Sequence, residues 1–147
     1  MYLILTRSFP PELGGMQSLM WGLTRELSKN FMIKVFVDHV ENHKDFDDQA
    51  SFSIERVGGI KLLRKYRKAQ LINECIKENR IEGIIADHWK SLELIKTDKK
   101  KYCLIHSKEI NHPKGTNLNK RVLNVLNNVE KVIANSKYTK NLAIECG

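Results

Sequence analysis

The sequence predicts an α/β fold of the Rossmann-like, doubly wound kind, in which a mostly parallel sheet carries helices on both faces. The main observation is that short apolar runs alternate along the chain with longer segments whose apolar residues recur at the helical period. With 147 residues, 41% hydrophobic and 29% charged, the chain has the size and composition of one folded domain. We therefore expect a single domain over residues 1–147, with ligands at the carboxyl ends of its strands.

The first part of the chain predicts a strand, a loop, a helix and a second strand. Residues 2–6 are a short apolar run, and two prolines and two glycines prevent regular structure over residues 7–15. Apolar residues then follow the period of 3.6 over residues 16–29, which predicts a helix with one buried face. Residues 32–38 are typical of a buried strand.

The remaining segments continue this alternation. Residues 39–50 are polar and acidic and predict a surface loop, in which Asp47 and Asp48 are interpreted as solvated. Further strands are predicted at residues 52–57, 81–87, 102–106 and 131–135, and further helices at 60–79, at 118–127 and from 136 onward.

The net charge, the cysteine spacing and the length of the apolar runs limit the possible partners, metal sites and location of the protein. The formal net charge of +8 predicts an electropositive face that attracts polyanions. Cys75, Cys103 and Cys146 lie far apart without a C-x-x-C spacing, so we expect free thiols and no zinc site. No apolar run approaches the roughly 20 residues that cross a bilayer, and we expect the protein in the cytoplasm.

Gly14 and Gly15 stand directly before the first predicted helix. Glycines at this place let a ligand approach the backbone, and the free amides of a helix start favour phosphate or diphosphate. The same pair is equally typical of a tight turn. The chain lacks both G-x-G-x-x-G and G-x-x-x-x-G-K-S/T, so a dinucleotide dehydrogenase and a P-loop nucleotidase are not supported.

Polar residues also follow the later strands. His106 ends one strand and Glu109 follows it, while His88 comes just after the strand before. A histidine at this edge can hydrogen-bond a sugar hydroxyl or phosphate, or act as an acid or base, although a single strand-end histidine is more often structural. Ser136 follows the last strand, where it is expected to cap the final helix and could also contact a ligand.

Three segments together resemble the amino-terminal domain of family 4 retaining glycosyltransferases, which have the two-domain GT-B architecture. They are FPPELGGMQ at residues 9–17, IHSKEI at 105–110 and VIANSKYT at 132–139, and their order and spacing agree with that family. The resemblance covers essentially the whole chain. One departure is Ser107, which stands where the family has glycine and leaves the placement of His106 open.

The resemblance implies a glycosyltransferase half that binds an acceptor, with a nucleotide diphosphate sugar as donor substrate and no separate cofactor. No carboxylate cluster of the D-x-D kind stands at a strand end, so we expect no metal ion to be needed. Gly14 and Gly15 then correspond to the glycines beside the donor diphosphate, and His106 to the catalytic histidine beside the donor sugar. Glu109, Ser136 and His88 are expected to contact substrate. The family carries most donor contacts, including a Glu-x7-Glu pair, in a second Rossmann-like domain, which this chain lacks. We therefore expect the isolated chain to be inactive until such a domain completes it in cis or in trans.

A basic helix is predicted within residues 60–79. Its first half combines apolar residues with five basic ones, Lys61, Arg64, Lys65, Arg67 and Lys68. Such a helix can lie on an anionic membrane surface, which would place the protein at the inner face of the membrane next to a lipid-linked acceptor. The simpler interpretation is a core-packing helix with a solvated cationic face, because every helix of this fold needs an apolar stripe.

Two other functions are compatible with the charge and the fold. A basic module that binds nucleic acid or another polyanion fits the charge alone, since the chain has no RNP-like strand, zinc spacing or helix-turn-helix, and no nucleic acid is expected as a partner. A domain that kept the fold and lost catalysis is the other alternative.

Overall fold

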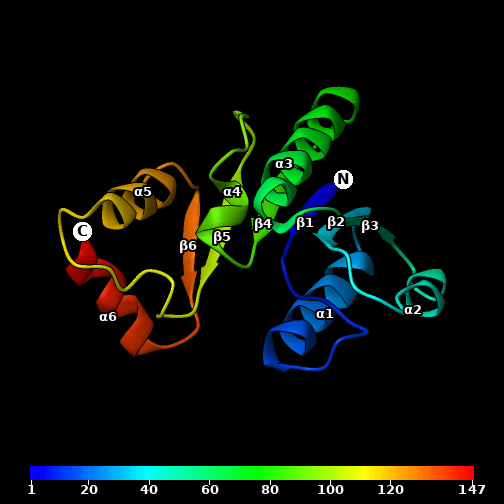
Figure 1. The fold of residues 1–147 in the computed structure, drawn as a ribbon, viewed down its shortest axis with the longest axis horizontal. Helices are drawn as coiled ribbons and strands as arrows, with labels where there is room; N and C mark the ends of the chain where they lie inside the picture. The colour runs from blue at the N-terminus through cyan, green and yellow to red at the C-terminus, as the bar shows by residue number, and fades with distance from the viewer.

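The computed structural model describes residues 1–147 and contains one six-stranded parallel sheet in the order β3-β2-β1-β4-β5-β6 (Figure 1). Every neighbouring pair of strands is parallel, so all six strands end at the same edge. The strands are β1 (Tyr2–Leu5), β2 (Ile33–Asp38), β3 (Ser53–Val57), β4 (Gly83–Ala86), β5 (Lys101–Ile105) and β6 (Lys131–Ala134). The predicted doubly wound α/β fold is confirmed.

Six helices connect or follow these strands. They are α1 (Gly15–Ser28), α2 (Lys44–Asp48), α3 (Lys61–Glu78), α4 (Trp89–Leu92), α5 (Asn117–Leu126) and α6 (Lys137–Cys146). Figure 1 places α5 and α6 beside β6 at one end of the sheet and α2 beside β3 at the other. The four longer helices begin within two residues of their predicted starts, whereas α2 and α4 are one-turn helices that the sequence pattern does not predict.

Two apolar cores lie on opposite faces of the sheet, because successive strand residues point to opposite sides. Leu3 and Leu5 of β1 belong to the larger core together with residues of α3, α4 and α5. Ile4 between them belongs to the smaller core, which packs against α1 and includes the partly buried Phe46 of α2. The three cysteines are free and buried. Helices therefore cover both faces, as the fold class requires.

The chain reverses its direction of travel across the sheet between β1 and β4. From β1 it moves outward through β2 to β3, and α3 then returns it to the other side of β1. In sheets of this order, ligands bind outside the carboxyl ends of the strands at this switch point. The residues that follow β1 and β4 therefore lie at this switch point.

No helix of the structure is both long enough and apolar enough to cross a membrane.

Candidate functional site

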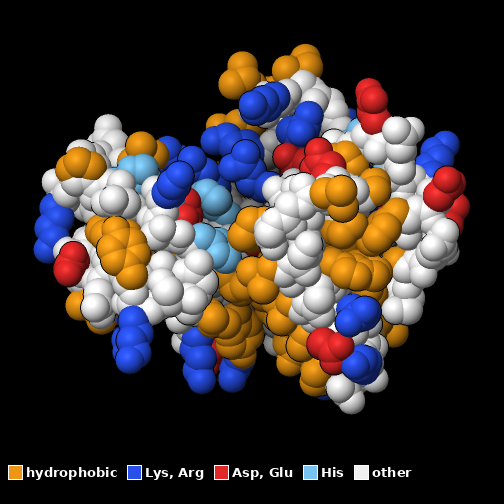
Figure 2. Space-filling view, turned by 90° about the horizontal axis from the view of Figure 1, so that it is seen from below, with side chains coloured by type: hydrophobic (Ala, Val, Ile, Leu, Met, Phe, Trp, Pro, Cys, Tyr) orange, Lys and Arg blue, Asp and Glu red, His pale blue; other side chains and the backbone are white.

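The residues predicted for the site follow β1, β4, β5 and β6, which are neighbours in the sheet. Gly15 begins the helix after β1, and His106 directly follows β5. The two positions therefore belong to the same edge of the sheet, as predicted. Seen from that edge, Figure 2 shows Lys and Arg side chains gathered beside histidines near the middle of the molecule.

The amino terminus of α1 is open toward the solvent. Gly14 is its N-cap in an extended conformation, no side chain caps the helix, and the first turn holds no acidic residue. The first bond of the helix runs from the amide of Ser18 to the carbonyl of Gly14 at 3.0 Å, so the amides before Ser18 have no helical acceptor. A Cβ on Gly15 would meet no atom within 4 Å. The packing of the chain therefore does not require glycine at this position.

An aromatic cluster and an ion pair hold the loop between β1 and α1. Phe9 is fully buried and makes edge-on contacts with Trp21, Phe46 and Phe52. The guanidinium of Arg56 donates to the carbonyl of Pro10 and pairs with the carboxylate of Asp47 at 2.8 Å. These contacts fix the loop that leads to Gly14.

The same contacts correct two sequence interpretations. Residues 39–50 are not only a loop, because α2 forms within them. The carboxylate of Asp47 is not simply solvated, because it accepts hydrogen bonds from Arg56 and contacts Nδ1 of His43 at 2.8 Å. Burial raises the pKa of Asp47, but these partners outweigh it and leave the pKa below its usual value.

A tight turn after β5 positions His106. The backbone amide of His106 donates to the carboxylate of Glu109, and the indole of Trp89 donates to the carbonyl of Glu109 at 2.8 Å. Ser107 has a φ of 89°, which lies in the region that favours glycine. The chain thus keeps a glycine-type turn without the glycine. The carboxylate of Glu109 supports this turn, whereas Nε2 of His106 is buried and has no hydrogen-bond partner.

His88 caps the start of α4. Its Nδ1 accepts from the amide of Lys90 at 3.0 Å, which leaves the imidazole proton on Nε2. Burial, with smaller contributions from Arg7, Lys90 and His106, lowers the pKa of His88 to about 4. Around pH 7 this imidazole is therefore neutral, and its Nε2–H group can donate to a hydroxyl or phosphate oxygen.

Two carboxylates at this edge were not singled out from the sequence. Asp87 follows β4 and accepts from the hydroxyl of Thr6 at 2.6 Å, while its second oxygen is buried without a partner. Burial raises the pKa of Asp87 above its usual value. Asp38 ends β2 and pairs with two basic residues of α3. Their positions at strand ends were the available signal, because ligands of this fold gather there.

Ser136 caps α6, as predicted. Its hydroxyl accepts from the amide of Thr139 at 3.1 Å and donates to the hydroxyl of the same residue at 3.0 Å. The residue is exposed at the end of β6. The capping role is satisfied within the chain, and contact between Ser136 and a ligand stays a prediction.

The five basic residues of α3 divide into two groups. Lys61, Lys65 and Arg67 are exposed, as a membrane-facing or solvated surface requires. Lys68 is 7% exposed, pairs with Asp38 and donates to the carbonyl of Thr6 at 3.0 Å, so its assignment to this surface is wrong. Arg64 is half-buried and also pairs with Asp38 at 3.4 Å. Both side chains thus reach Asp38 at the end of β2, and Lys68 also reaches Thr6 just after β1.

The structure contains no group of three or more His, Cys, Asp and Glu side chains that could hold a metal ion.

No family model and no curated protein matches this chain. Its fold resembles that of HepE from Anabaena. The likeness covers 99% of this chain, with TM-scores of 0.72, 0.69 and 0.70 against HepE in complex with UDP, with UDP and glucose, and with UDP-glucose.

The likeness to HepE establishes the fold alone, because the two sequences are only 18% identical. The chain spans 40 to 41% of the length of the HepE chains.

Proposed function

We propose that this chain is the acceptor-side, N-terminal domain of a GT-B glycosyltransferase that transfers a hexose, with retention, from a nucleotide diphosphate sugar. The observation that carries the proposal is the placement of the open α1 start at Gly15 and of His106 at one edge of a Rossmann-like sheet. Both belong to the segments that resemble family 4 glycosyltransferases. The likeness to HepE, which binds UDP and UDP-glucose, supports a uridine diphosphate sugar as the donor.

The chemistry assigned to each residue follows from its surroundings. The uncapped amides of α1 are suited to the donor diphosphate, because the start of a helix carries a partial positive charge. The unpartnered Nε2 of His106 is suited to the donor sugar, whose hydroxyl groups would supply the missing hydrogen bond. The neutral His88 would donate from Nε2 to the substrate, while Glu109 acts by holding the turn of His106.

A second Rossmann-like domain, in cis or in trans, completes the enzyme in this proposal. HepE is about two and a half times as long as this chain, so the HepE chain is long enough to contain a second domain of this size. The isolated chain is expected to bind nucleotide sugars weakly and to have no transferase activity.

Peripheral membrane association is a further part of the proposal. Four apolar side chains at the start of α3 are exposed, namely Ile60 (71%), Leu62 (81%), Leu63 (60%) and Tyr66 (54%). Lys61, Lys65 and Arg67 flank them. An exposed surface that combines apolar and basic side chains suits an anionic bilayer, which would bring the domain to a lipid-linked acceptor at the inner face of the membrane.

A titration followed by amide NMR tests the donor site even at millimolar affinity. We expect UDP-glucose to shift the amide signals of Gly14, Gly15 and His106, and to leave those of α2 unchanged. GDP-glucose and ADP-glucose serve as comparisons for the base. Shifts confined to other parts of the chain would contradict the site, and micromolar binding by the chain alone would contradict the divided donor site.

A variant at Gly15 separates binding from stability. In Gly15→Leu the Cβ of the new side chain has open space around it and the position is exposed, so the unfolding midpoint should stay the same or rise slightly. The same side chain would cover the amides at the start of α1 and abolish the shifts caused by UDP-glucose. Gly22→Ala is the matched control, because Gly22 also has open space around its Cβ but lies inside α1. Unchanged shifts in Gly15→Leu would exclude α1 as the diphosphate site.

A further inference from the structure

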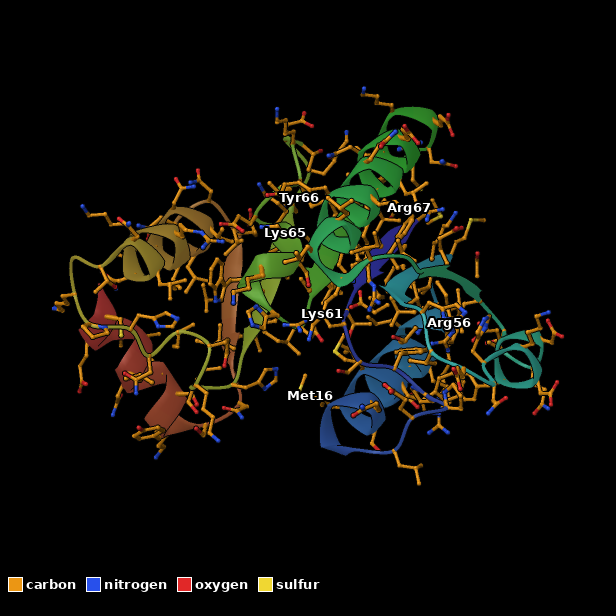
Figure 3. The ribbon with its side chains drawn as sticks, in the orientation of Figure 1. Met16, Arg56, Lys61, Lys65, Tyr66 and Arg67 are labelled. Carbon is orange, nitrogen blue, oxygen red and sulfur yellow. The ribbon has the colours of Figure 1, made fainter.

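A cavity of about 410 Å³ lies beside the switch point, between the first half of α3, α4 and α5. Its lining contains seven basic side chains and two carboxylates. The basic residues are Arg7, Lys61, Arg64, Lys65, Lys68, Lys90 and Arg121. Figure 3 shows Lys65 on the side of α3 that faces α4, and Arg67, which does not line the cavity, on the other side.

Ion pairs within the chain neutralise only part of this charge. Asp38 pairs with Lys68 and Arg64. Glu93 accepts two hydrogen bonds from the guanidinium of Arg121, at 2.6 and 2.9 Å. Both carboxylates of the cavity are thus engaged. The remaining four basic side chains, Arg7, Lys61, Lys65 and Lys90, form no salt bridge in the structure.

Two buried polar atoms of the cavity residues have no partner. They are Oγ of Ser91 and Nε of Arg64. Leaving such groups unsatisfied is unfavourable, and both can donate a hydrogen bond to an anion. Unpaired cations and unsatisfied donors in one cavity indicate an anionic ligand with several acceptor oxygens.

Apolar side chains also line the cavity. They are Leu62, Ala69, Ile72 and Leu94. Leu62 is also part of the exposed apolar surface at the start of α3. A ligand that fills the cavity would therefore contact the four free cations and also apolar side chains such as Leu62.

We infer that this cavity binds a phosphoryl group, either a phosphomonoester or a diphosphate, carried by the acceptor. Four unpaired cations favour a ligand with two or more negative charges over a carboxylate, and guanidinium and ammonium groups are the usual partners of phosphate oxygens. The role as acceptor rests on the proposed function, whereas the binding of the phosphoryl group does not.

The position of the cavity suits an acceptor. Arg7 follows β1 and Lys90 follows His88 by two residues, so both belong to the switch-point edge. The charges of Arg7 and Lys90 both contribute to the lowered pKa of His88, which is consistent with their closeness to its ring. A phosphoryl group held by Arg7 and Lys90 would lie on the α3 side of the histidines, while α1 lies on the other face of the sheet.

Calorimetric titration of the chain with inorganic pyrophosphate tests the inference. In Arg7→Gln/Lys90→Gln, both changes lie outside α3 and break no salt bridge, and we expect the affinity to fall at least about tenfold. Lys77→Gln/Arg80→Gln is the control, because it removes the same charge from exposed positions outside both the cavity and the membrane surface proposed at the start of α3, and it should change the affinity less than about twofold. Equal losses in both variants, or no binding by the parent at about 10 mM, would overturn the cavity as a phosphoryl site.

Vesicles distinguish the two sources of the phosphoryl group. If it belongs to a lipid, the parent chain should sediment with phosphatidylcholine vesicles that contain phosphatidic acid, the Arg7→Gln/Lys90→Gln variant should sediment several-fold less, and the control should behave as the parent. If it belongs to a soluble acceptor, pyrophosphate binds as above and the two variants sediment equally. Either result supports the phosphoryl site.

The donor titration separates this inference from the proposed function. Pyrophosphate binding that depends on Arg7 and Lys90, without any effect of UDP-glucose at Gly15, would retain the phosphoryl site and remove its role in glycosyl transfer. UDP-glucose binding at Gly15 without pyrophosphate binding in the cavity would retain the proposed function and remove the phosphoryl site.

Discussion

The two halves of α3 both contain lysine and leucine but have opposite surroundings. Residues 68–75 bury Lys68, Ala69, Ile72 and Cys75 against the sheet. Residues 60–67 instead expose Leu62, Leu63 and Tyr66 beside basic side chains. The difference shows that leucine and lysine do not by themselves mark the inside and outside of this helix. Its position over the edge of the sheet decides which turn is covered.

The largest effect is expected from the one lysine of α3 that is buried. In Lys68→Gln the ammonium that pairs with Asp38 is lost, and Arg64 remains as a more distant partner at 3.4 Å. Removing one member of a buried pair leaves an uncompensated charge, so we expect the free energy of unfolding to fall by about 3 kcal/mol. Urea denaturation followed by circular dichroism measures this change.

Lys65→Gln is the control within the same helix. Lys65 is exposed and forms no salt bridge, so its replacement should change the free energy of unfolding by less than about 0.5 kcal/mol. Equal effects at the two positions would show that the halves of α3 do not differ in the way described.

The exposed apolar surface of the first half gives an intermediate effect. We expect Ile60→Ser/Leu63→Ser to reduce co-sedimentation with phosphatidylglycerol-containing vesicles about tenfold, because two side chains that would insert into the bilayer are removed. We expect this double variant to remain folded. Ile60 is the N-cap of α3 and its side chain makes no capping hydrogen bond, whereas serine is a favoured cap and contributes about 0.5 to 1 kcal/mol.

Salt and neutral lipid provide the controls for this experiment. Adsorption of the parent should be absent on phosphatidylcholine alone and should weaken as the Debye length decreases from about 10 Å at 0.1 M salt to about 3 Å at 1 M. If the double variant sediments as well as the parent, the first half of α3 is a solvated surface and the membrane part of the proposal is wrong.

The smallest effect on the free energy of unfolding is expected in the turn after β5. There, as in the first half of α3, the residue type does not match its surroundings. Ser107 has a φ of 89°, a conformation that disfavours a side chain with a Cβ. Ser107→Gly should therefore raise the free energy of unfolding by about 0.5 to 1 kcal/mol, after the greater chain entropy of glycine is included. Ser107→Ala keeps the Cβ and should give no gain in urea denaturation, so equal gains in both variants would contradict this explanation.

The sequence by itself determined the order of the elements and the edge at which the site lies. Apolar periodicity is a local property, and it located all six strands and the four longer helices within a few residues. Because parallel strands end at a common edge, the alternation of strands and helices is enough to place Gly15, His88, His106 and Ser136 at that one edge of the sheet.

Only the tertiary structure decided which polar groups are paired. The salt bridge between Asp38 and Lys68 joins residues 30 positions apart, and that between Glu93 and Arg121 joins residues 28 apart. The apolar periodicity within either segment does not predict such a contact. The cationic cavity likewise depends on side chains from the β1 loop, α3, α4 and α5, whose distances are set by how the helices cross the sheet. The local sequence specifies each element, whereas burial and charge pairing depend on what packs against it.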